Sequence, residues 1–262
     1  MDLERHRLSF GSAAQHYDQV RPSYPAAAVS WAIGADRAQV ADLGAGTGLL
    51  TRAIRDLGHR VTAVEPDPGM LAQLIAATPD VVALAGSAEA TGLPTASMDA
   101  VLAGAAYHWF KPELANPEIA RVLRPGGHFA ALWNDRDDSV PWIREYNRII
   151  DDFYENRRRQ EQTIDLGDQF GPVESAEFPH QTRHTPQSLL DLIKSRSYYL
   201  VADVETRQRL IAAVGQLIET HPELAGRESF ELPYVTRVRR AVRLATAVSR
   251  RCARTPSAGR ST

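Results

Sequence analysis

Short apolar runs alternate with stretches of helically spaced apolar residues through the first half of the chain. This alternation is typical of a parallel β-sheet whose strands are joined by crossover helices. Asp67 and Pro68 fit the N-cap and the first position of one helix, and Pro117 predicts a bend in another. The helices expected in this half are 49–57, 68–77 and 112–123. The expected strands are 39–43, 61–64, 81–84, 99–103 and 128–133, the last entered through the turn "RPGG".

The pattern changes after Asp135, where longer helical stretches dominate. Alternating apolar positions near residue 230 predict a last strand, in which Pro233 is better placed at a sheet edge than in the centre. We expect the segment 139–228 to lie over the sheet as a cap without a core of its own. The elements predicted here are helices 141–162, 186–194 and 204–219 and a sixth strand at 178–183.

The composition is that of a globular protein, with 262 residues of which 44% are hydrophobic. No stretch approaches the roughly 20 apolar residues that span a bilayer, and the charged N-terminal stretch "MDLERHRLSFGS" is unlike a secretion signal. Cys252 is the only cysteine, so the sequence predicts no internal disulfide and no metal cluster. We therefore expect a cytoplasmic protein that does not associate with membranes.

Charge is distributed unevenly along the chain. From Val235 onward there are eight arginines and no acidic residue, and the remainder has 22 basic against 32 acidic side chains. An acidic body is a poor surface for nucleic acid, so we expect no nucleic-acid partner. The residues 241–262 are interpreted as a basic, flexible tail.

A glycine-rich loop in "VADLGAGTGLL" follows the first predicted strand. The dinucleotide fingerprint G-x-G-x-x-G is not met, because Leu49 stands where its third glycine belongs, and no Gly-Lys-Ser/Thr of a phosphate-binding P-loop follows. Asp42, two residues before Gly44, would repel a pyrophosphate and attract a cation. Glu65 ends the second predicted strand, where its two oxygens can accept hydrogen bonds from both hydroxyls of a ribose.

Four motifs in order, "VADLGAGTGLL", "VTAVEPDPGM", "LAGSAEATGLPTASMDAVLAG" and "RVLRPGGHFAALW", resemble those of class I S-adenosylmethionine-dependent methyltransferases. The resemblance covers residues 10–135 well and continues more loosely through "SRSYYL" and "FELPYVTRVRRA". With "FGSAAQHYDQVRPSYP" and "AAYHWF", the chain is most similar to the small-molecule, trans-aconitate methyltransferase-like branch. The family's fold is a doubly wound, mostly parallel seven-stranded α/β sheet with a helical cap and one antiparallel strand near its edge.

The resemblance implies S-adenosyl-L-methionine as the cofactor and assigns its contacts along the chain. Asp42 orients the methionine end, Glu65 holds the ribose hydroxyls, and Tyr17 and Arg21 can reach the methionine carboxylate. The implied cofactor-binding residues are Tyr17, Arg21, Asp42, Gly44, Ala45, Gly46, Glu65, Pro66, Met70, Ser87, Ala88, Glu89, Gly104 and Ala105.

The acceptor side is less defined by the sequence. His108 and Trp109 follow the fourth strand and are interpreted either as contacts of a small-molecule substrate or as a core pair. The amino-group methylation motif N/D-P-P-Y/F is absent from "AGAAYHWF", and no catalytic base or metal site is assigned. The Y-x-x-x-K spacing of Tyr107 and Lys111 is attributed to chance. A non-catalytic S-adenosylmethionine-binding protein and a nicotinamide-dependent oxidoreductase stay open as alternatives, as do the methylated atom and the oligomeric state.

These expectations divide the chain into one methyltransferase domain, 1–240, and the tail. Residues 1–28 are predicted to form an N-terminal lid. The parts that follow it are a cofactor-binding core at 29–138, the cap and sixth strand at 139–228, and the last strand at 229–240.

Overall fold

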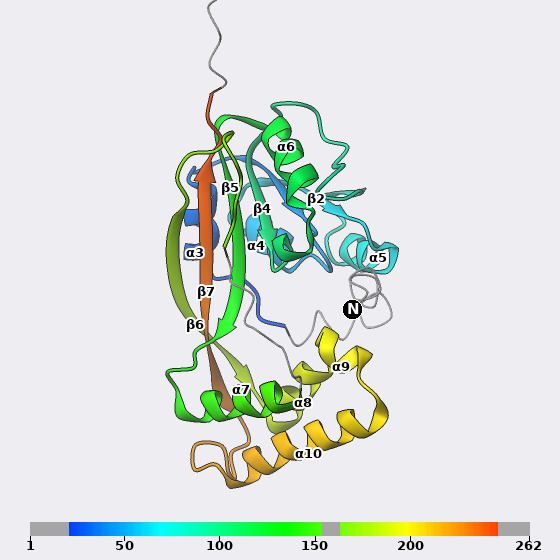
Figure 1. Cartoon of the computed structure of the whole chain (residues 1–262), viewed down its shortest axis with the longest axis vertical. Helices are drawn as coiled ribbons and strands as arrows, with labels where there is room; N and C mark the ends of the chain where they lie inside the picture. The colour runs from blue at the N-terminus through cyan, green and yellow to red at the C-terminus, as the bar shows by residue number, and fades with distance from the viewer. Residues whose placement is uncertain (1–20, 154–162, 246–262) are drawn as a thin grey trace, which may run out of the picture.

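A seven-stranded sheet forms the centre of the protein, in the order β3-β2-β1-β4-β5-β7-β6 (Figure 1). The computed structural model describes residues 21–153 and 163–245. The strands are β1 (Gln39–Leu43), β2 (Arg60–Glu65), β3 (Val82–Ala85), β4 (Met98–Gly104), β5 (Leu123–Arg136), β6 (Glu174–His184) and β7 (Phe230–Val242).

The direction of the strands agrees with the predicted mostly parallel sheet. The neighbours from β3 through β5 all pair in parallel, whereas β7 is antiparallel to both β5 and β6. The antiparallel strand therefore lies next to the edge strand β6.

Helices cover both faces of this sheet. In β4, Leu102 packs into one apolar cluster with α3 (Ala26–Ile33) and α4 (Leu49–Asp56). The next residue, Ala103, packs into another cluster with α6 (Pro112–Val122). Successive side chains of a strand point to opposite faces, so the two clusters lie on opposite sides of the sheet. The sheet is thus doubly wound, and no helix in the described ranges is long and apolar enough to cross a membrane.

The helix α5 (Pro68–Ala77) begins and ends where the sequence predicts. The Asp67 carboxylate accepts hydrogen bonds from the backbone N–H groups of Gly69 and Met70, at 2.8 and 2.9 Å. Pro68 occupies the first turn, where its missing N–H costs nothing. The Asp67 cap and Pro68 therefore mark the start of α5 at the predicted residue.

The cap is built from four helices at the lower end of the molecule in Figure 1. They are α7 (Pro141–Phe153), α8 (Pro186–Lys194), α9 (Ser197–Val201) and α10 (Val204–Thr220). The cap has its own buried apolar cluster, in which Trp142, Tyr146 and Leu217 pack with Phe230 and Leu232 of β7. The prediction that the cap lacks a core is therefore wrong, because α7 and α10 bury apolar stripes against each other and against the end of β7.

Several predicted boundaries also need correction. β5 begins at Leu123, so "RPGG" lies within the strand, where its pairing with β4 shifts between Met98 and Ala100. β7 continues to Val242, and the Arg243 guanidinium donates to the Leu123 carbonyl, so the tail cannot begin at 241. Residues 154–162 and 246–262, which include the end of the predicted helix 141–162, lie outside the described residues.

Pro233 lies in an internal strand rather than at a sheet edge. Pro233 nevertheless lies just beyond the region where β5 and β7 pair. The last pair of these two strands joins Arg136 to Tyr234, the residue that follows Pro233 in the sequence. At Pro233 the paired strand is β6, through Gln181, and the Asp137 N–H just after β5 donates to the Pro233 carbonyl. Pro233 can accept but not donate on that side, so its missing N–H coincides with the end of the β5–β7 ladder.

Candidate functional site

The carboxyl ends of β1, β2 and β4 meet at one edge of the sheet, because these strands are parallel neighbours. Asp42 lies near the end of β1, Glu65 ends β2, and Gly104 ends β4. Ligands of open α/β sheets bind at this edge. The structure therefore brings together three positions that are far apart in the sequence.

The glycine loop after β1 adopts a conformation that favours glycine. Gly44, Gly46 and Gly48 have φ angles of 66°, 58° and 88°. A Cβ atom on Gly44 would lie 2.8 Å from Cβ of Ala106, whereas one on Gly46 would meet nothing within 4 Å. Gly44 is thus enclosed by the residues after β4, and Gly46 faces open space.

The Glu65 carboxylate fixes this loop to the second strand. Its Oε2 accepts a hydrogen bond from the Gly46 N–H, and its Oε1 accepts one from the Asp67 N–H, both at 2.8 Å. Glu65 is buried, so these bonds to backbone donors stabilise its charge. Each carboxylate oxygen has more than one acceptor position, so the geometry is compatible with the predicted ribose contact.

Asp42 is fully buried, and its two oxygens have different surroundings. Oδ2 accepts a 2.6 Å hydrogen bond from the Thr51 hydroxyl, whereas Oδ1 has no partner among the described residues. Burial raises the pKa of Asp42 to about 7; the Thr51 hydrogen bond opposes this rise and the nearby Glu65 charge adds to it. An unpartnered buried carboxylate oxygen fits a ligand that brings a cationic donor, such as an ammonium group.

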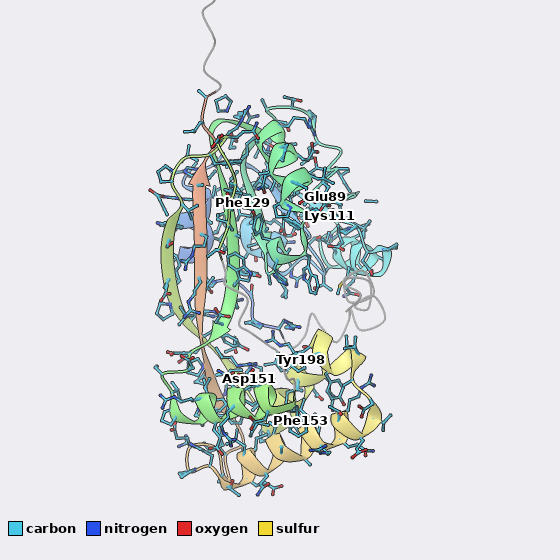
Figure 2. All side chains as sticks on the ribbon, viewed as in Figure 1. Glu89, Lys111, Phe129, Asp151, Phe153 and Tyr198 are labelled. Carbon is cyan, nitrogen blue, oxygen red and sulfur yellow. The ribbon has the colours of Figure 1, made fainter. Side chains whose placement is uncertain are left out.

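The loop after β3 contains the residues predicted to face the adenine ring. Ser87 and Ala90 form an isolated β-bridge, and Ala88 between them is buried. Glu89 accepts a 2.9 Å hydrogen bond from the Lys111 N–H, and Figure 2 shows these two residues side by side. The loop is thereby tied to the chain after β4.

Pro66 and Met70 lie at the start of α5, where Pro66 is partly buried and Met70 is buried. Ala45 of the glycine loop is likewise buried, and its N–H donates to the Val64 carbonyl at 3.2 Å. After β4, Ala105 has a positive φ of 50° and its N–H donates to the Leu132 carbonyl. All four residues thus lie close to the strand ends that the prediction assigns to the cofactor.

Residues 21–25 lie between the sheet edge and the cap. The Arg21 side chain donates to the hydroxyl and the carbonyl of Ser195, at 3.1 and 3.0 Å. Asn134 of β5 donates to the carbonyls of Pro22 and Ser23. A Cβ atom on Gly104 would lie 2.7 Å from the Tyr24 hydroxyl. The predicted role of Arg21 at the methionine carboxylate stays a prediction, and Tyr17 lies outside the described residues.

Sequence reasoning missed Tyr24, Thr51 and Asn134. Thr51 carries a weak signal, since it is a polar residue next to the buried Leu50 on the helix that follows the glycine loop. Tyr24 and Asn134 carry no such signal, because their contacts join segments that are far apart in the sequence.

The short 3₁₀ helix Tyr107–Trp109 follows β4. The His108 side chain is exposed and its ring centroid lies 4.8 Å from that of Trp109. The Tyr107 hydroxyl is instead bonded to Asn116 and to the Asp165 carbonyl, at 3.3 and 3.1 Å. Tyr107 is therefore a buried structural residue, while a substrate contact at His108 and Trp109 stays a prediction.

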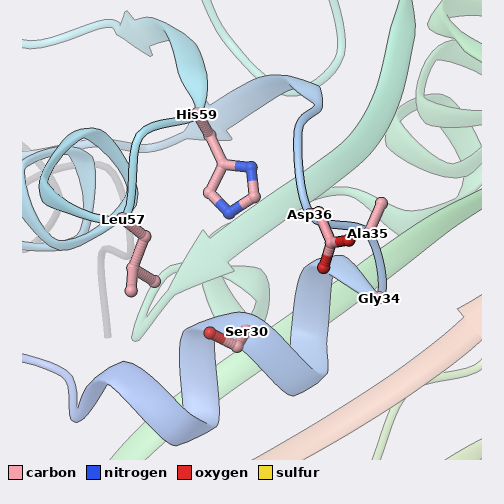
Figure 3. A pocket seen from close by; sticks show the side chains of 6 residues that line it. All are labelled: Ser30, Gly34, Ala35, Asp36, Leu57 and His59. Atoms are coloured by element: carbon pink, nitrogen blue, oxygen red, sulfur yellow. The ribbon is translucent and has the colours of Figure 1, made fainter.

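A pocket of about 370 Å³ opens at the end of the sheet where the strands β1 and β2 begin (Figure 3). Its lining comes from the turns before β1 and β2 and from α3 and includes Asp36 and His59. Ligands of open α/β sheets bind at the carboxyl ends of the strands, whereas this pocket lies at the amino ends. It is therefore not the candidate cofactor site.

The histidines of β6 contact hydroxyl and aromatic side chains of β6, β7 and α8. His184 is bonded to Ser188 and Thr182, and the His180 ring stacks on Tyr234 at a centroid distance of 5.5 Å. In the part of the chain that the structure describes, no three His, Cys, Asp or Glu residues are grouped to hold a metal ion.

The sheet order, the glycine loop and the two acidic strand ends together define a class I S-adenosylmethionine-dependent methyltransferase. Residues 41–131 match the family model described as "Methyltransferase domain". A protein of Mycobacterium tuberculosis named "Uncharacterized methyltransferase" is 44% identical over 229 residues, which are 87% of this chain and 93% of that protein. The chain therefore belongs to the S-adenosylmethionine-dependent methyltransferases.

Solved structures agree with this assignment. A putative type II methyltransferase from Anaeromyxobacter dehalogenans has a TM-score of 0.63 and 25% identity, covering 85% of this chain and 97% of its own. The fold also matches phosphoethanolamine N-methyltransferase 2 of Haemonchus contortus in complex with S-adenosyl-L-methionine, with a TM-score of 0.52 and 15% identity, over 90% of this chain and 57% of that one. The protein is thus an enzyme that uses S-adenosylmethionine, and the nicotinamide-dependent alternative has no support.

Proposed function

We propose that the enzyme transfers the methyl group of S-adenosylmethionine to a small molecule, as in the trans-aconitate methyltransferase-like branch. The observation that carries the proposal is the position of residues 21–25, which bridge the sheet edge and the cap. Arg21 is bonded to Ser195 of the cap, and Tyr24 lies against Gly104 at the end of β4. An acceptor that reaches this edge must pass between protein segments, which favours a small molecule over a folded macromolecule.

Charge supports the same conclusion. Half of the arginines after Val235 lie within β7 or directly after it rather than in the tail. Arg237 pairs with Asp135 and Glu177, and Arg240 pairs with Glu174. These guanidinium groups are neutralised by neighbouring carboxylates, so they offer little to a phosphate backbone. We therefore infer that nucleic acid is not the substrate.

The proposed cofactor contacts follow from the site. Asp42 Oδ1 accepts from the ammonium group of the methionine end, Glu65 accepts from the ribose hydroxyls, and the loop at Gly46 borders the cofactor. Ser87, Ala88 and Glu89 lie along the adenine, and Gly104 and Ala105 along the methionyl portion. The cofactor, when bound, supplies a methyl group on a sulfonium. The chain aligns the acceptor with that methyl group and excludes water.

The reaction is a displacement at the methyl carbon. A bond forms from the acceptor nucleophile to that carbon while the carbon–sulfur bond breaks, and S-adenosylhomocysteine leaves with the electron pair. A carboxylate acceptor has no proton to lose, so positioning alone is sufficient for it. His108 is exposed beside Trp109 and is proposed as a substrate contact and not as a base.

An acceptor screen tests this proposal. The full chain is incubated with S-adenosylmethionine carrying an isotopically labelled methyl group and a panel of small carboxylic acids, phenols and amines. We expect labelled small-molecule product and S-adenosylhomocysteine in equal amounts, both absent with Asp42→Asn. Label found only in added protein or nucleic acid, with the small-molecule panel unlabelled, would overturn the small-molecule assignment.

A further inference from the structure

A group of arginines and tyrosines meets where β5 and β7 enter the cap. We call Arg136, Arg196, Tyr146, Tyr198 and Tyr234 the Arg–Tyr cluster. Arg136 ends β5, Tyr146 lies in α7, Tyr234 in β7, and Arg196 and Tyr198 at the start of α9. Figure 2 shows Tyr198 on the side of the cap that faces the cofactor-binding half.

The contacts within the Arg–Tyr cluster are close. The Arg136 guanidinium carbon lies 4.7 Å from the centroid of the Tyr146 ring, and Nε of Arg136 donates to Asn147 at 2.6 Å. The Tyr198 phenol lies close enough to Arg136 to favour its charged form and so to raise its pKa. The charges of Arg21, Arg136 and Arg196 all act on the Tyr234 phenol. Three cations therefore lie near enough to one buried hydroxyl to lower its pKa electrostatically.

Several polar atoms of the cluster have no hydrogen-bond partner. Tyr146 is fully buried and Tyr234 is 1% exposed, yet neither hydroxyl has a partner among the described residues, and the same holds for the buried Nε of Arg196. Across the described ranges, neither Arg136 nor Arg196 forms an ion pair with a carboxylate. Buried polar groups in native proteins are almost always paired, so this concentration of unused donors points to a ligand.

The donors specify the kind of ligand. Guanidinium groups have donors only. Burial raises the pKa of Tyr146 and of Tyr234, so both phenols keep their protons near neutral pH and can donate. A ligand for this set must supply acceptor oxygens and negative charge, which are the properties of a carboxylate or a phosphate.

The cluster lies beyond the point of methyl transfer. Leu132 of β5 pairs with Gly104, the last residue of β4, and Arg136 follows four residues later. At about 3.3 Å per residue, Arg136 is about 13 Å further along the strand than the end of β4. Its contacts with Tyr146 and Asn147 direct its side chain into the cap. A group bound there is an anchor, remote from the methylated atom.

We propose that the Arg–Tyr cluster binds an anionic group, a carboxylate or a phosphate, at the end of the acceptor that is not methylated. The acceptor is then an elongated small molecule with its nucleophile near Gly104 and its anion in the cap. This inference rests on the proposed function, because it assumes a small-molecule acceptor.

Anion binding to the full chain tests the inference directly. Isothermal calorimetry is carried out with S-adenosylhomocysteine present, titrating inorganic phosphate or glutarate and using chloride at matched ionic strength as the reference. We expect phosphate or glutarate to bind more tightly than chloride, and the anion that binds identifies the chemistry of the anchor. If neither anion binds better than chloride, the inference is wrong.

Variants separate a binding role from a structural one. Tyr146→Phe, Tyr234→Phe and Arg196→Gln should each weaken the bound anion by roughly tenfold. Tyr199→Phe is the matched control, since this tyrosine of α9 packs its ring against Arg207 of α10, and it should leave the affinity unchanged. If Arg196→Gln does not fold, the anion affinities of the two phenylalanine variants still test the inference. Equal anion affinity in wild type and both phenylalanine variants would contradict the inference.

The free enzyme provides a second readout. Because the Tyr146 hydroxyl has no partner there, Tyr146→Phe should not lower the unfolding midpoint in the absence of anion. A lowered midpoint would indicate a structural hydrogen bond instead. The acceptor screen distinguishes the two proposals. A methylated small-molecule product, together with phosphate and glutarate binding no better than chloride, would contradict the anchor alone. Anion binding without any methylated small-molecule product would contradict the proposed function.

Discussion

The cofactor-binding edge and the Arg–Tyr cluster both contain buried polar atoms without partners, but of opposite kinds. At the edge, the unpartnered atom is an acceptor, Oδ1 of Asp42. In the cap, the unpartnered atoms are donors, on Tyr146, Tyr234 and Arg196. A protein that leaves an acceptor unused in one place and donors in another is arranged for two ligand groups of opposite charge. We assign the first to the ammonium group of the cofactor and the second to an anion on the acceptor.

The two regions also differ in how they are held. Glu65 receives two backbone N–H groups, and Asp67 caps α5, so the cofactor edge is fixed by hydrogen bonds within residues 46–70. The Arg–Tyr cluster depends on packing between β5, β7 and the cap helices. Local motifs therefore specify the cofactor edge, whereas tertiary packing specifies the acceptor end.

The largest effect is expected at Asp42, whose pKa of about 7 compares with an ordinary value of 3.8. Below pH 3.8 the Asp42 carboxyl is protonated in both the folded and the unfolded chain, and its contribution to the free energy of unfolding is fully present. As the pH rises through 7 this contribution is lost, because the unfolded chain ionises at a lower pH than the folded one. The difference corresponds to about 4 kcal/mol. Asp42→Asn should therefore be more stable than wild type at pH 8 by up to this amount, with a flatter dependence on pH. Urea unfolding between pH 5 and 8.5 measures it.

The same variant should lose cofactor affinity, so stability and binding change in opposite directions. In wild type, binding of S-adenosylhomocysteine should tighten as the pH rises toward 7, because Asp42 must ionise to meet an ammonium group. Calorimetry in two buffers of different ionisation enthalpy should detect proton release at pH 6 and none at pH 8.5. Proton release that persists in Asp42→Asn would show that another group titrates.

Two glycines of one loop should respond differently to alanine. Gly44→Ala places a Cβ 2.8 Å from Ala106 at a φ of 66°, and we expect a loss of about 2–5 kcal/mol in the free energy of unfolding. Gly46→Ala meets open space at a φ of 58° and should cost only about 1–2 kcal/mol. Its cofactor affinity should fall all the same. Equal losses of stability in the two variants would mean that the space at Gly46 is not open.

Glu65→Gln should weaken S-adenosylhomocysteine binding by about 1–3 kcal/mol, the range for a lost charge-assisted hydrogen bond. The residue also accepts from Gly46 and Asp67, so the unfolding midpoint is measured in parallel. Glu177→Gln is a suitable control, since Glu177 lies on the edge strand β6 and pairs with Arg237, away from the proposed cofactor contacts. Unchanged affinity in Glu65→Gln would remove this residue from the cofactor site.

The smallest effect compares two buried tyrosines. The Tyr107 hydroxyl is bonded to Asn116 and to the Asp165 carbonyl, so Tyr107→Phe should lower the free energy of unfolding by about 1 kcal/mol. Tyr146→Phe loses no such bond in the free enzyme. Thermal unfolding of the two variants without ligand distinguishes them. Similar losses would show that the cap hydroxyl has a structural role as well.

Much of the cofactor-binding half follows from local sequence signals. β1 and α5 have the predicted bounds, because an apolar run and an Asp-Pro cap are sufficient to specify them. α3 was not predicted, and neither was α9, which has only five residues. The residue types of "RPGG" predict a turn, because turn residues indicate local conformation and not strand pairing.

The acceptor end could not be predicted for a different reason. Arg136 and Tyr234 are nearly a hundred residues apart in the sequence, and they become neighbours only because β7 returns antiparallel to β5. Neither residue belongs to a motif with a known spacing. The core of the cap was missed likewise, since the stripes on α7 and α10 have no visible partner until the two helices pack together.

A crystal structure of the full chain with S-adenosylhomocysteine tests directly whether the unpartnered carboxylate oxygen of Asp42 contacts the cofactor. We expect the ammonium group of the ligand within about 3 Å of Asp42 Oδ1. We also expect the ribose hydroxyls to donate to Glu65. A ligand bound at this edge with Asp42 Oδ1 still unpartnered, or a ligand bound elsewhere on the sheet, would contradict this expectation.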